Sequence, residues 1–169
     1  MIVLVMGVAG AGKTTIGAAL ARRLSSRFID ADDYHPPQNI AKMKAGIPLN
    51  DADRRPWLEG LNKELRISDL ISQDAVIACS ALKQSYRERL AQDIRDFRIV
   101  HLHGSPELIR TRMATRRHRY MPATLLDSQF TVLEPPDDAI SIDIAATPDD
   151  CVARIVARLT AGTIPRPGD

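Results

Sequence analysis

The sequence predicts an α/β fold in which a five-stranded parallel sheet lies between two layers of helices. Two observations predict it. Short apolar runs rich in Val and Ile recur at residues 2–6, 28–29, 75–79, 97–102 and 140–145, each separated from the next by at least one helical stretch. Such alternation is typical of parallel sheets with helices on both faces. The first run also leads directly into a glycine-rich loop followed by a helix.

That loop, Gly7-Val8-Ala9-Gly10-Ala11-Gly12-Lys13-Thr14, fits the pattern G-x-x-x-x-G-K-[ST]. Glycines let the backbone turn tightly and point its N–H groups inward, and the next helix adds its positive dipole end. We expect residues from Gly7 to Thr15 to bind the phosphates of ATP, with Lys13 at the β- and γ-phosphates and the Thr14 hydroxyl on Mg²⁺. A purely structural turn is disfavoured by the strand before it and by the helix expected at residues 15–24.

Helix starts are marked by capping residues and prolines. Pro36 and Pro37 open a helix, and another is expected at about residues 53–70. Ser105-Pro106-Glu107 and Thr147-Pro148-Asp149-Asp150 each place a capping side chain before a proline and acidic residues.

The connection between the fourth and fifth strands is long and divided. A helix is expected at residues 106–116, then an irregular basic stretch to Pro122, then a helix near residues 124–133. An excursion of this kind is typical of a lid, placed at about residues 112–134. The chain is expected to be one kinase-sized domain over residues 1–162, with the lid inside it and a flexible tail at 163–169.

Length, net charge and cysteine spacing exclude several classes of protein function. A chain of 169 residues has the length of one domain, and its net charge of +2 gives no bulk attraction to nucleic acids or membranes. The spacing of Cys79 and Cys151 indicates neither a disulfide scaffold nor a zinc site. Without a basic leader or an apolar stretch of about 18 residues, a cytoplasmic location is expected.

The positive charge is concentrated at Arg110, Arg112, Arg116, Arg117 and Arg119. This cluster could be a solvated helix face or a patch for nucleic acid. Single-strand binding surfaces interleave aromatic residues, and only Tyr120 is present. A lid that brings Arg116 over the transferring phosphate explains the cluster better, because the developing charge needs a fixed cation.

Carboxylates gather where the second strand ends, in Asp30-Ala31-Asp32-Asp33-Tyr34-His35. Ligands of open α/β sheets bind beyond the carboxyl ends of the strands, so these side chains face the phosphate loop. We expect Asp30 on the metal side and Asp32 as the group that accepts the proton of an attacking hydroxyl, although Asp33 stays open as the base. Ordinary turn chemistry is the alternative.

A phosphate loop alone permits a kinase, a switch GTPase or a motor ATPase. The guanine-specific Asn/Thr-Lys-x-Asp element is missing, since the nearest string is Asn62-Lys63-Glu64-Leu65. Chain length and the expected lid favour a small-molecule kinase.

Three further strings carry a family resemblance. They are Asp32-Asp33-Tyr34-His35-Pro36 with Asn39-x-x-Lys42-Met43-x-x-Gly46-x-Pro48-Leu49-x-Asp51-x-Asp53-Arg54-x-Pro56-Trp57-Leu58, then Cys79-Ser80-Ala81-Leu82-Lys83-x-x-Tyr86-Arg87, and Leu125-Leu126-x-Ser128-Gln129-Phe130-x-x-Leu133-Glu134-Pro135. Over residues 3–159 the chain resembles the bacterial gluconate kinases. The resemblance implies transfer of phosphate from ATP, with Mg²⁺, to the 6-hydroxyl of D-gluconate. It also implies a nucleoside-monophosphate-kinase-like fold and a homodimer.

The resemblance also implies roles for single residues. By analogy with shikimate kinase, a more distant relative, Asp32 acts on the hydroxyl and Arg54 binds the carboxylate. His35, Ser80 and Lys83 are expected to contact substrate, the last two because they follow the central third strand. Arg112 is expected to stack on adenine with Pro148 opposite. Trp57 is expected mainly in the core.

The lid departs from the family pattern. Arg-Lys-Gly-His-Phe is usual there, whereas this chain has Arg116-Arg117-His118-Arg119-Tyr120. A role of the family's lid histidine therefore does not carry over to Arg119, while phosphate contact by Arg116 is less affected. A kinase for shikimate or another aldonate, and a nucleotide switch without an acceptor, remain alternatives. Only a kinase needs Asp32, Arg54 and Ser80 around a second pocket.

Overall fold

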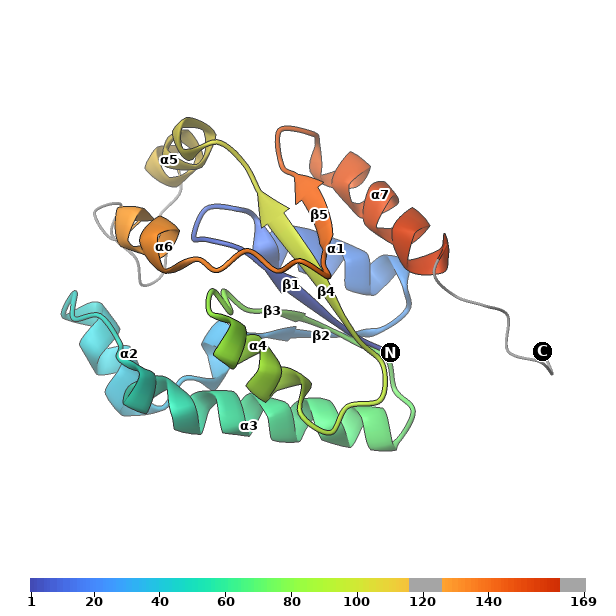
Figure 1. The fold of residues 1–169 in the computed structure, drawn as a ribbon, viewed down its shortest axis with the longest axis horizontal. Coiled ribbons are helices and arrows are strands. Elements are labelled where there is room, and N and C mark those ends of the chain that lie inside the picture. Colours follow the sequence, from blue (N-terminus) through green and yellow to red (C-terminus); the bar gives the residue numbers. More distant parts are fainter. Residues whose placement is uncertain (116–125, 162–169) are drawn as a thin grey trace.

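The computed structural model describes residues 1–115 and 126–161. Its sheet has five parallel strands in the order β2-β3-β1-β4-β5 (Figure 1). The strands are β1 (Ile2–Met6), β2 (Arg27–Asp30), β3 (Ala75–Ala78), β4 (Phe97–His103) and β5 (Ile140–Asp143). The predicted α/β class and parallel sheet are confirmed. The middle strand is β1, and β3, expected to be central, lies next to it.

The helices within the described residues are connections between these strands or flank them. They are α1 (Lys13–Arg23), α2 (Pro37–Lys44), α3 (Asp51–Leu70), α4 (Gln84–Ala91), α5 (Pro106–Thr115), α6 (Leu126–Val132) and α7 (Pro148–Ala161), with a 3-10 turn, η1 (Ala31–Tyr34), after β2.

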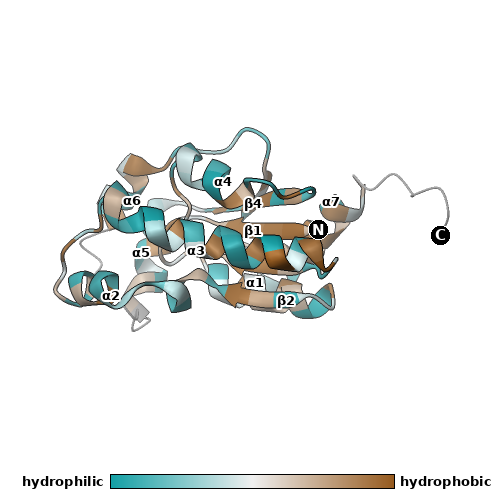
Figure 2. Ribbon diagram, turned by 90° about the horizontal axis from the view of Figure 1, so that it is seen from below, coloured by the Kyte–Doolittle hydropathy of each residue, from teal (hydrophilic) through white to brown (hydrophobic). Residues whose placement is uncertain are grey.

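The middle strand separates two hydrophobic cores. Val3 and Val5 face the core shared with α1 and α7, whereas Ile2, Leu4 and Met6 face the core shared with α3 and α4. Every residue of β1 is buried, as expected for a strand covered on both faces. In Figure 2 this strand is brown along its length, while α3 and α4 also carry hydrophilic teal residues. The predicted three-layer arrangement is confirmed.

Helix α3 begins at Asp51, two residues before the expected start. The side chain of Asn50 accepts a hydrogen bond from the Asp53 backbone N–H, and the Asp53 carboxylate accepts one from the Asn50 N–H. This reciprocal capping fixes the helix start, and the sequence interpretation had overlooked it. Helix α4 and η1 were not delineated from the sequence.

The predicted lid and tail fall partly outside the described residues. Helices α5 and α6 flank residues 116–125, which contain Arg116 and the altered string at His118 and Arg119. The lid therefore stays a prediction, as does the tail at 163–169. In the two described ranges, 1–115 and 126–161, each helix is too short or too polar to cross a bilayer.

Candidate active site

The loop between β1 and α1 passes close to β4 and α5, so only glycine fits at two of its positions. Gly7 has φ +144°, and a Cβ there would lie 2.5 Å from the Leu102 carbonyl oxygen. Gly10 has φ +81°, and a Cβ there would lie 2.7 Å from Met113. Gly12, at φ 92°, caps α1 without a side-chain hydrogen bond. The helix start thus lacks a side-chain cap, which suits its first-turn N–H groups to binding an anion.

Lys13 and Thr14 connect this loop to the carboxylates after β2. Lys13 Nζ donates to the Val8 carbonyl oxygen at 3.1 Å. Burial lowers the pKa of Lys13, and the carboxylate of Asp32, with a smaller effect of Asp30, opposes that shift. The Thr14 hydroxyl donates to Asp30 Oδ2 at 3.0 Å. The predicted phosphate and metal residues are therefore close together.

The turn after β2 gives its carboxylates different surroundings. Asp30 accepts from the Asp32 backbone N–H at 3.1 Å in addition to the Thr14 hydroxyl. The Asp32 side chain is 61% exposed, and its Oδ1 lies 4.0 Å from His35 Nε2. Asp33 is exposed. Asp30 is thus fixed by the phosphate loop, whereas the Asp32 carboxylate is accessible to an incoming hydroxyl.

His35 is buried rather than solvent-facing. Its ring stacks on Trp57 with centroids 4.1 Å apart, and Trp57 donates to the Ala31 carbonyl at 2.8 Å. Burial, with a smaller effect of Arg54, lowers the pKa of His35 to about 4. The imidazole is therefore neutral at pH 7, and because its Nδ1 already lies 3.5 Å from the Asn39 amide nitrogen, Nε2 is the nitrogen left for another partner.

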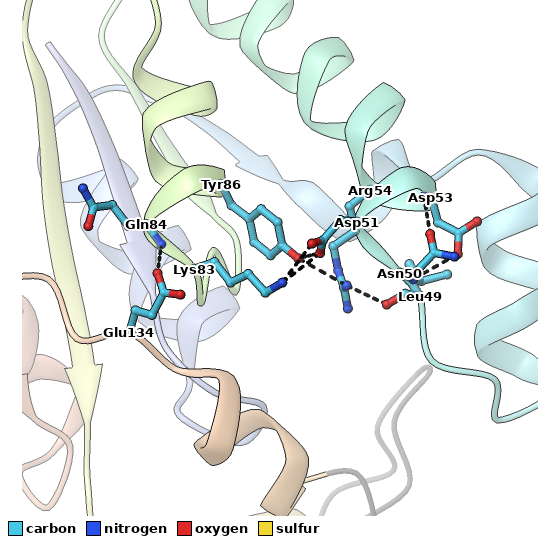
Figure 3. A network of polar contacts seen from close by, with 9 residues as sticks. All are labelled: Leu49, Asn50, Asp51, Asp53, Arg54, Lys83, Gln84, Tyr86 and Glu134. Atoms are coloured by element: carbon cyan, nitrogen blue, oxygen red, sulfur yellow. Dashed lines mark hydrogen bonds and ion pairs between the residues drawn. The ribbon is translucent and has the colours of Figure 1, made fainter.

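Arg54 lies in the first turns of α3, on one side of the Tyr86 ring (Figure 3). Its Nη1 donates to the Leu49 carbonyl at 2.6 Å and to the Tyr86 hydroxyl at 3.4 Å. Within residues 1–115 and 126–161 it forms no ion pair with a carboxylate. A half-buried guanidinium held by neutral partners is suited to binding an external anion.

Lys83 also lies beside Tyr86 but has a protein partner. Its Nζ contacts both carboxylate oxygens of Asp51, at 3.0 and 2.9 Å, and the Tyr86 hydroxyl donates to the same carboxylate (Figure 3). These hydrogen bonds, from Tyr86 first and then Lys83, lower the pKa of Asp51. Asp51 therefore balances the charge of Lys83, a role that the sequence interpretation had missed for both Asp51 and Tyr86.

The segment after β3 contacts the phosphate loop. The Ser80 carbonyl accepts from the Gly7 N–H at 3.4 Å. Ala81 has φ +42°, and the buried guanidinium of Arg87 donates to the carbonyls of Ala81 and Leu82 at 3.2 and 3.1 Å. Arg87 thus shapes the stretch that carries Ser80 and Lys83. The sequence interpretation quoted Arg87 in a family string without assigning it this role.

Of the two residues predicted to flank adenine, Arg112 donates from Nη2 to the Ile144 carbonyl at 2.6 Å, in the segment between β5 and the exposed Pro148. The structure thus brings α5 to the segment that precedes Pro148. Arg116, predicted to be catalytic, lies outside the described residues.

Two further polar residues reach these loops from the segment at α6. Gln129 Oε1 accepts from the Ala9 N–H at 2.7 Å, and Glu134 Oε2 accepts from the Gln84 N–H at 2.5 Å. Both residues belong to one of the strings that resemble the gluconate kinases, and this resemblance was the only indication of their importance in the sequence. Their partners could not be inferred from it.

Comparison with known proteins agrees with this geometry. The family model "Shikimate kinase" matches residues 9–129, more than half of the chain. With the parallel sheet and the phosphate loop, this match places the protein among the P-loop kinases. A probable gluconokinase of Xenopus tropicalis is 44% identical over 162 residues, covering 85% of each chain. The thermosensitive gluconokinase of Escherichia coli K12 is 45% identical over 145 residues, covering 83% of this chain and 78% of that one.

A solved structure leads to the same family. The gluconokinase from Sinorhizobium meliloti 1021 superimposes with a TM-score of 0.85 at 38% identity, covering 94% of this chain and 91% of that one. The chain belongs to the gluconokinase family.

Proposed function

We propose that the protein is a gluconokinase that transfers the γ-phosphoryl group of ATP to the 6-hydroxyl of D-gluconate, giving 6-phospho-D-gluconate and ADP. Family membership supports the reaction class. The observation that carries the substrate assignment is Arg54, a guanidinium that lowers the pKa of His35 and forms no ion pair with a carboxylate among the described residues.

Each side of the site has a defined task in this reaction. Arg54 binds the gluconate carboxylate, and the neutral imidazole of His35 contacts a substrate hydroxyl, with Ser80 as a further contact. Asp32 accepts the proton of the 6-hydroxyl as its oxygen attacks the γ-phosphorus. The bond from that phosphorus to the β–γ bridging oxygen then breaks, and ADP leaves. Lys13 and the loop N–H groups stabilise the charge that develops on the phosphate oxygens.

The residues present fit a magnesium ion. The Thr14 hydroxyl and the Asp30 carboxylate supply two hard oxygen ligands 3.0 Å apart. Magnesium in kinases is held by one or two such groups together with substrate phosphates. Within the described ranges no group of three or more His, Cys, Asp or Glu side chains is arranged to hold a metal ion. Bound there, the ion would neutralise charge on the β- and γ-phosphates.

Three further contacts belong to the proposal. Arg112 and Pro148 flank adenine, Arg116 contacts the transferring phosphate, and Lys83 contributes positive charge at the acceptor side. The proposed assembly is a homodimer, as the family resemblance implies, and the proposed location is the cytoplasm. Light scattering of the purified protein measures the oligomeric state.

The test compares gluconate with glucose, which has the same terminal hydroxyl but no carboxylate. Arg54→Leu should lower kcat/KM for gluconate by roughly 10²–10⁴-fold, equivalent to about 3–5 kcal/mol, and should change the slow glucose reaction little. Arg54→Lys should restore only part of the loss, because a point charge cannot form the bidentate contact.

Arg55→Leu is the matched control, since Arg55 is the exposed neighbour on α3. It should behave like the wild type. If Arg54→Leu lowers kcat/KM for gluconate and for glucose by the same factor, Arg54 does not bind the carboxylate, and another residue must do so. Faster wild-type turnover of shikimate or another aldonate than of gluconate would replace the substrate assignment.

A further inference from the structure

Residues 126–134, which comprise α6 and the two residues after it, contact both halves of the proposed site. The string Ser128-Gln129-Phe130-x-x-Leu133-Glu134 was recognised in the sequence, yet the proposed reaction assigns it no task. One of its side chains reaches the loop that binds ATP phosphates, and another reaches the segment that carries acceptor-side residues.

The contact to the phosphate loop is made by a neutral amide. Gln129 Oε1 accepts from the Ala9 N–H at 2.7 Å in a partly buried position. Ala9 lies between Val8, whose carbonyl accepts from Lys13, and Gly10, which packs against α5. Gln129 therefore fixes the third residue of the loop between two constrained neighbours.

The contact to the acceptor side is a pair of hydrogen bonds. The Glu134 backbone N–H donates to the Leu82 carbonyl at 2.9 Å, and Glu134 Oε2 accepts from the Gln84 N–H at 2.5 Å (Figure 3). Gln84 is the first residue of α4, so the carboxylate caps that helix. Lys83, which contacts Asp51, lies between these two bonded residues.

The segment that makes these contacts is packed into the molecule. Leu126 is 1% exposed in the core shared by α1 and α7. Phe130 packs against the same core, and Leu133 packs against both cores. A packed helix holds its side chains more rigidly than a surface loop does. Gln129 lies within α6, and Glu134 lies two residues beyond the end of this helix, directly after the packed Leu133. The two side chains therefore belong to one short packed segment.

We infer that Gln129 and Glu134 are positioning residues that hold the phosphate loop and the acceptor segment at a fixed separation. Phosphoryl transfer depends on in-line placement of the attacking oxygen and the γ-phosphorus, and a shift of about 1 Å can cost on the order of 10² in rate. Gln129 acts through Ala9, and Glu134 acts through Leu82 and Gln84. The neutral amide also avoids placing a negative charge beside the phosphates. This inference rests on the proposed function.

The experiment separates kcat from KM in variants of Gln129. Gln129→Met keeps the length of the side chain but cannot accept the Ala9 hydrogen bond. It should lower kcat at least about tenfold and change KM for ATP and gluconate less than about threefold. Gln129→Glu restores the acceptor but adds a charge, so it should keep more of kcat and raise KM for ATP.

Glu134→Ala provides the second arm. It should lower kcat. The double variant with Gln129→Met should lose less kcat than the product of the two single fold-losses, because both residues hold the same separation between the phosphate loop and the acceptor segment. Asp127→Asn is the control on the same helix, since the Asp127 side chain is exposed and forms a surface ion pair with Arg110. It should match the wild type. Thermal unfolding of every variant corrects kcat for the folded fraction.

The outcomes distinguish the two proposals. If the wild type does not phosphorylate gluconate, the proposed function fails, whatever the variants do. If the wild type is active and Gln129→Met keeps its kcat, the inference fails. Tighter ATP binding by Gln129→Met at unchanged kcat would also contradict the inference. It would indicate that Gln129 occupies the Ala9 N–H only until a phosphate oxygen of ATP replaces it.

Discussion

Asp30 and Asp32 are chemically identical residues separated by one position, and their surroundings assign them different tasks. Asp30 accepts hydrogen bonds from the Thr14 hydroxyl and the Asp32 N–H. The Asp32 side chain is 61% exposed and lies 4.0 Å from His35. A carboxylate already bonded to a phosphate-loop hydroxyl suits a metal, whereas an accessible one suits proton transfer.

Substitution of each by asparagine tests this division. Asp32→Asn should lower kcat by on the order of 10²-fold or more with a smaller change in KM for gluconate, because the amide cannot accept the proton. Asp30→Asn should mainly raise the Mg²⁺ concentration needed for half-maximal rate. Steady-state rates across a magnesium titration measure both effects. A larger loss of kcat in Asp30→Asn at saturating magnesium would exchange the two roles.

Contiguous motifs allowed the sequence to predict the phosphate loop and the carboxylates after β2, because those residues lie next to one another in the chain. The contact of Gln129 with Ala9 joins residues 120 positions apart. The pairing of Lys83 with Asp51 spans 32 positions and depends on how α3 packs against α4. A local sequence pattern cannot predict contacts between residues so far apart in the chain. These contacts could be identified only from the three-dimensional structure.

At the scale of elements, the first turn of α3 is the clearest link between stability and the acceptor side. Its reciprocal cap joins Asn50 to Asp53, and Lys42 adds an ion pair to Asp53 at 2.6 Å. The same turn carries Asp51 and Arg54. Loss of the cap should therefore loosen the residues proposed to bind gluconate.

Asn50→Ala should lower the free energy of unfolding by about 1 kcal/mol and raise KM for gluconate more than KM for ATP. Urea unfolding and steady-state kinetics measure the two effects. Ser105→Ala removes the cap of α5, in which the Ser105 hydroxyl accepts from the Leu108 N–H at 3.2 Å. This control should lose similar stability without changing KM for gluconate. Unchanged gluconate kinetics in Asn50→Ala would show that the acceptor residues do not depend on the cap.

At the scale of the whole molecule, the sequence predicted five strands and three layers but not the order of the strands. Apolar runs report burial, and every residue of both β1 and β3 is buried. Since β1 and β3 are both interior and buried on both faces, burial could not show which of the two lies in the middle. The order follows from the crossover connections, in which α1 packs on β3 and α7.

Global stability should also depend on pH through His35. Its pKa is lowered from 6.5 to about 4 by burial, with a smaller effect of Arg54. At pH values between about 4 and 6.5, His35 is protonated in the unfolded chain but neutral in the folded protein. The contribution of the neutral imidazole is therefore fully present above pH 6.5 and is lost as the pH falls toward 4, by about 3 kcal/mol in total.

Other titratable groups also contribute to the pH dependence of stability. Burial also lowers the pKa of His101, so it adds a slope of the same sign. Asp51 and Asp53 have pKa values held below 3.8 by hydrogen bonds, from Tyr86 and Lys42 respectively, so their contribution is lost mainly below that pH. A window from pH 6.5 to 4.5 therefore reports mainly on the two histidines.

His35→Phe isolates the contribution of His35, because phenylalanine keeps a ring against Trp57 but does not titrate. Urea unfolding at intervals of about half a pH unit gives the free energy of unfolding across that window. The wild type should lose stability steadily with acidification, and His35→Phe should lose it with a clearly smaller slope, whatever its absolute stability. Parallel curves for the two proteins would show that the imidazole is protonated in the fold near pH 6.5, and its proposed contact with a substrate hydroxyl would then involve a charged donor.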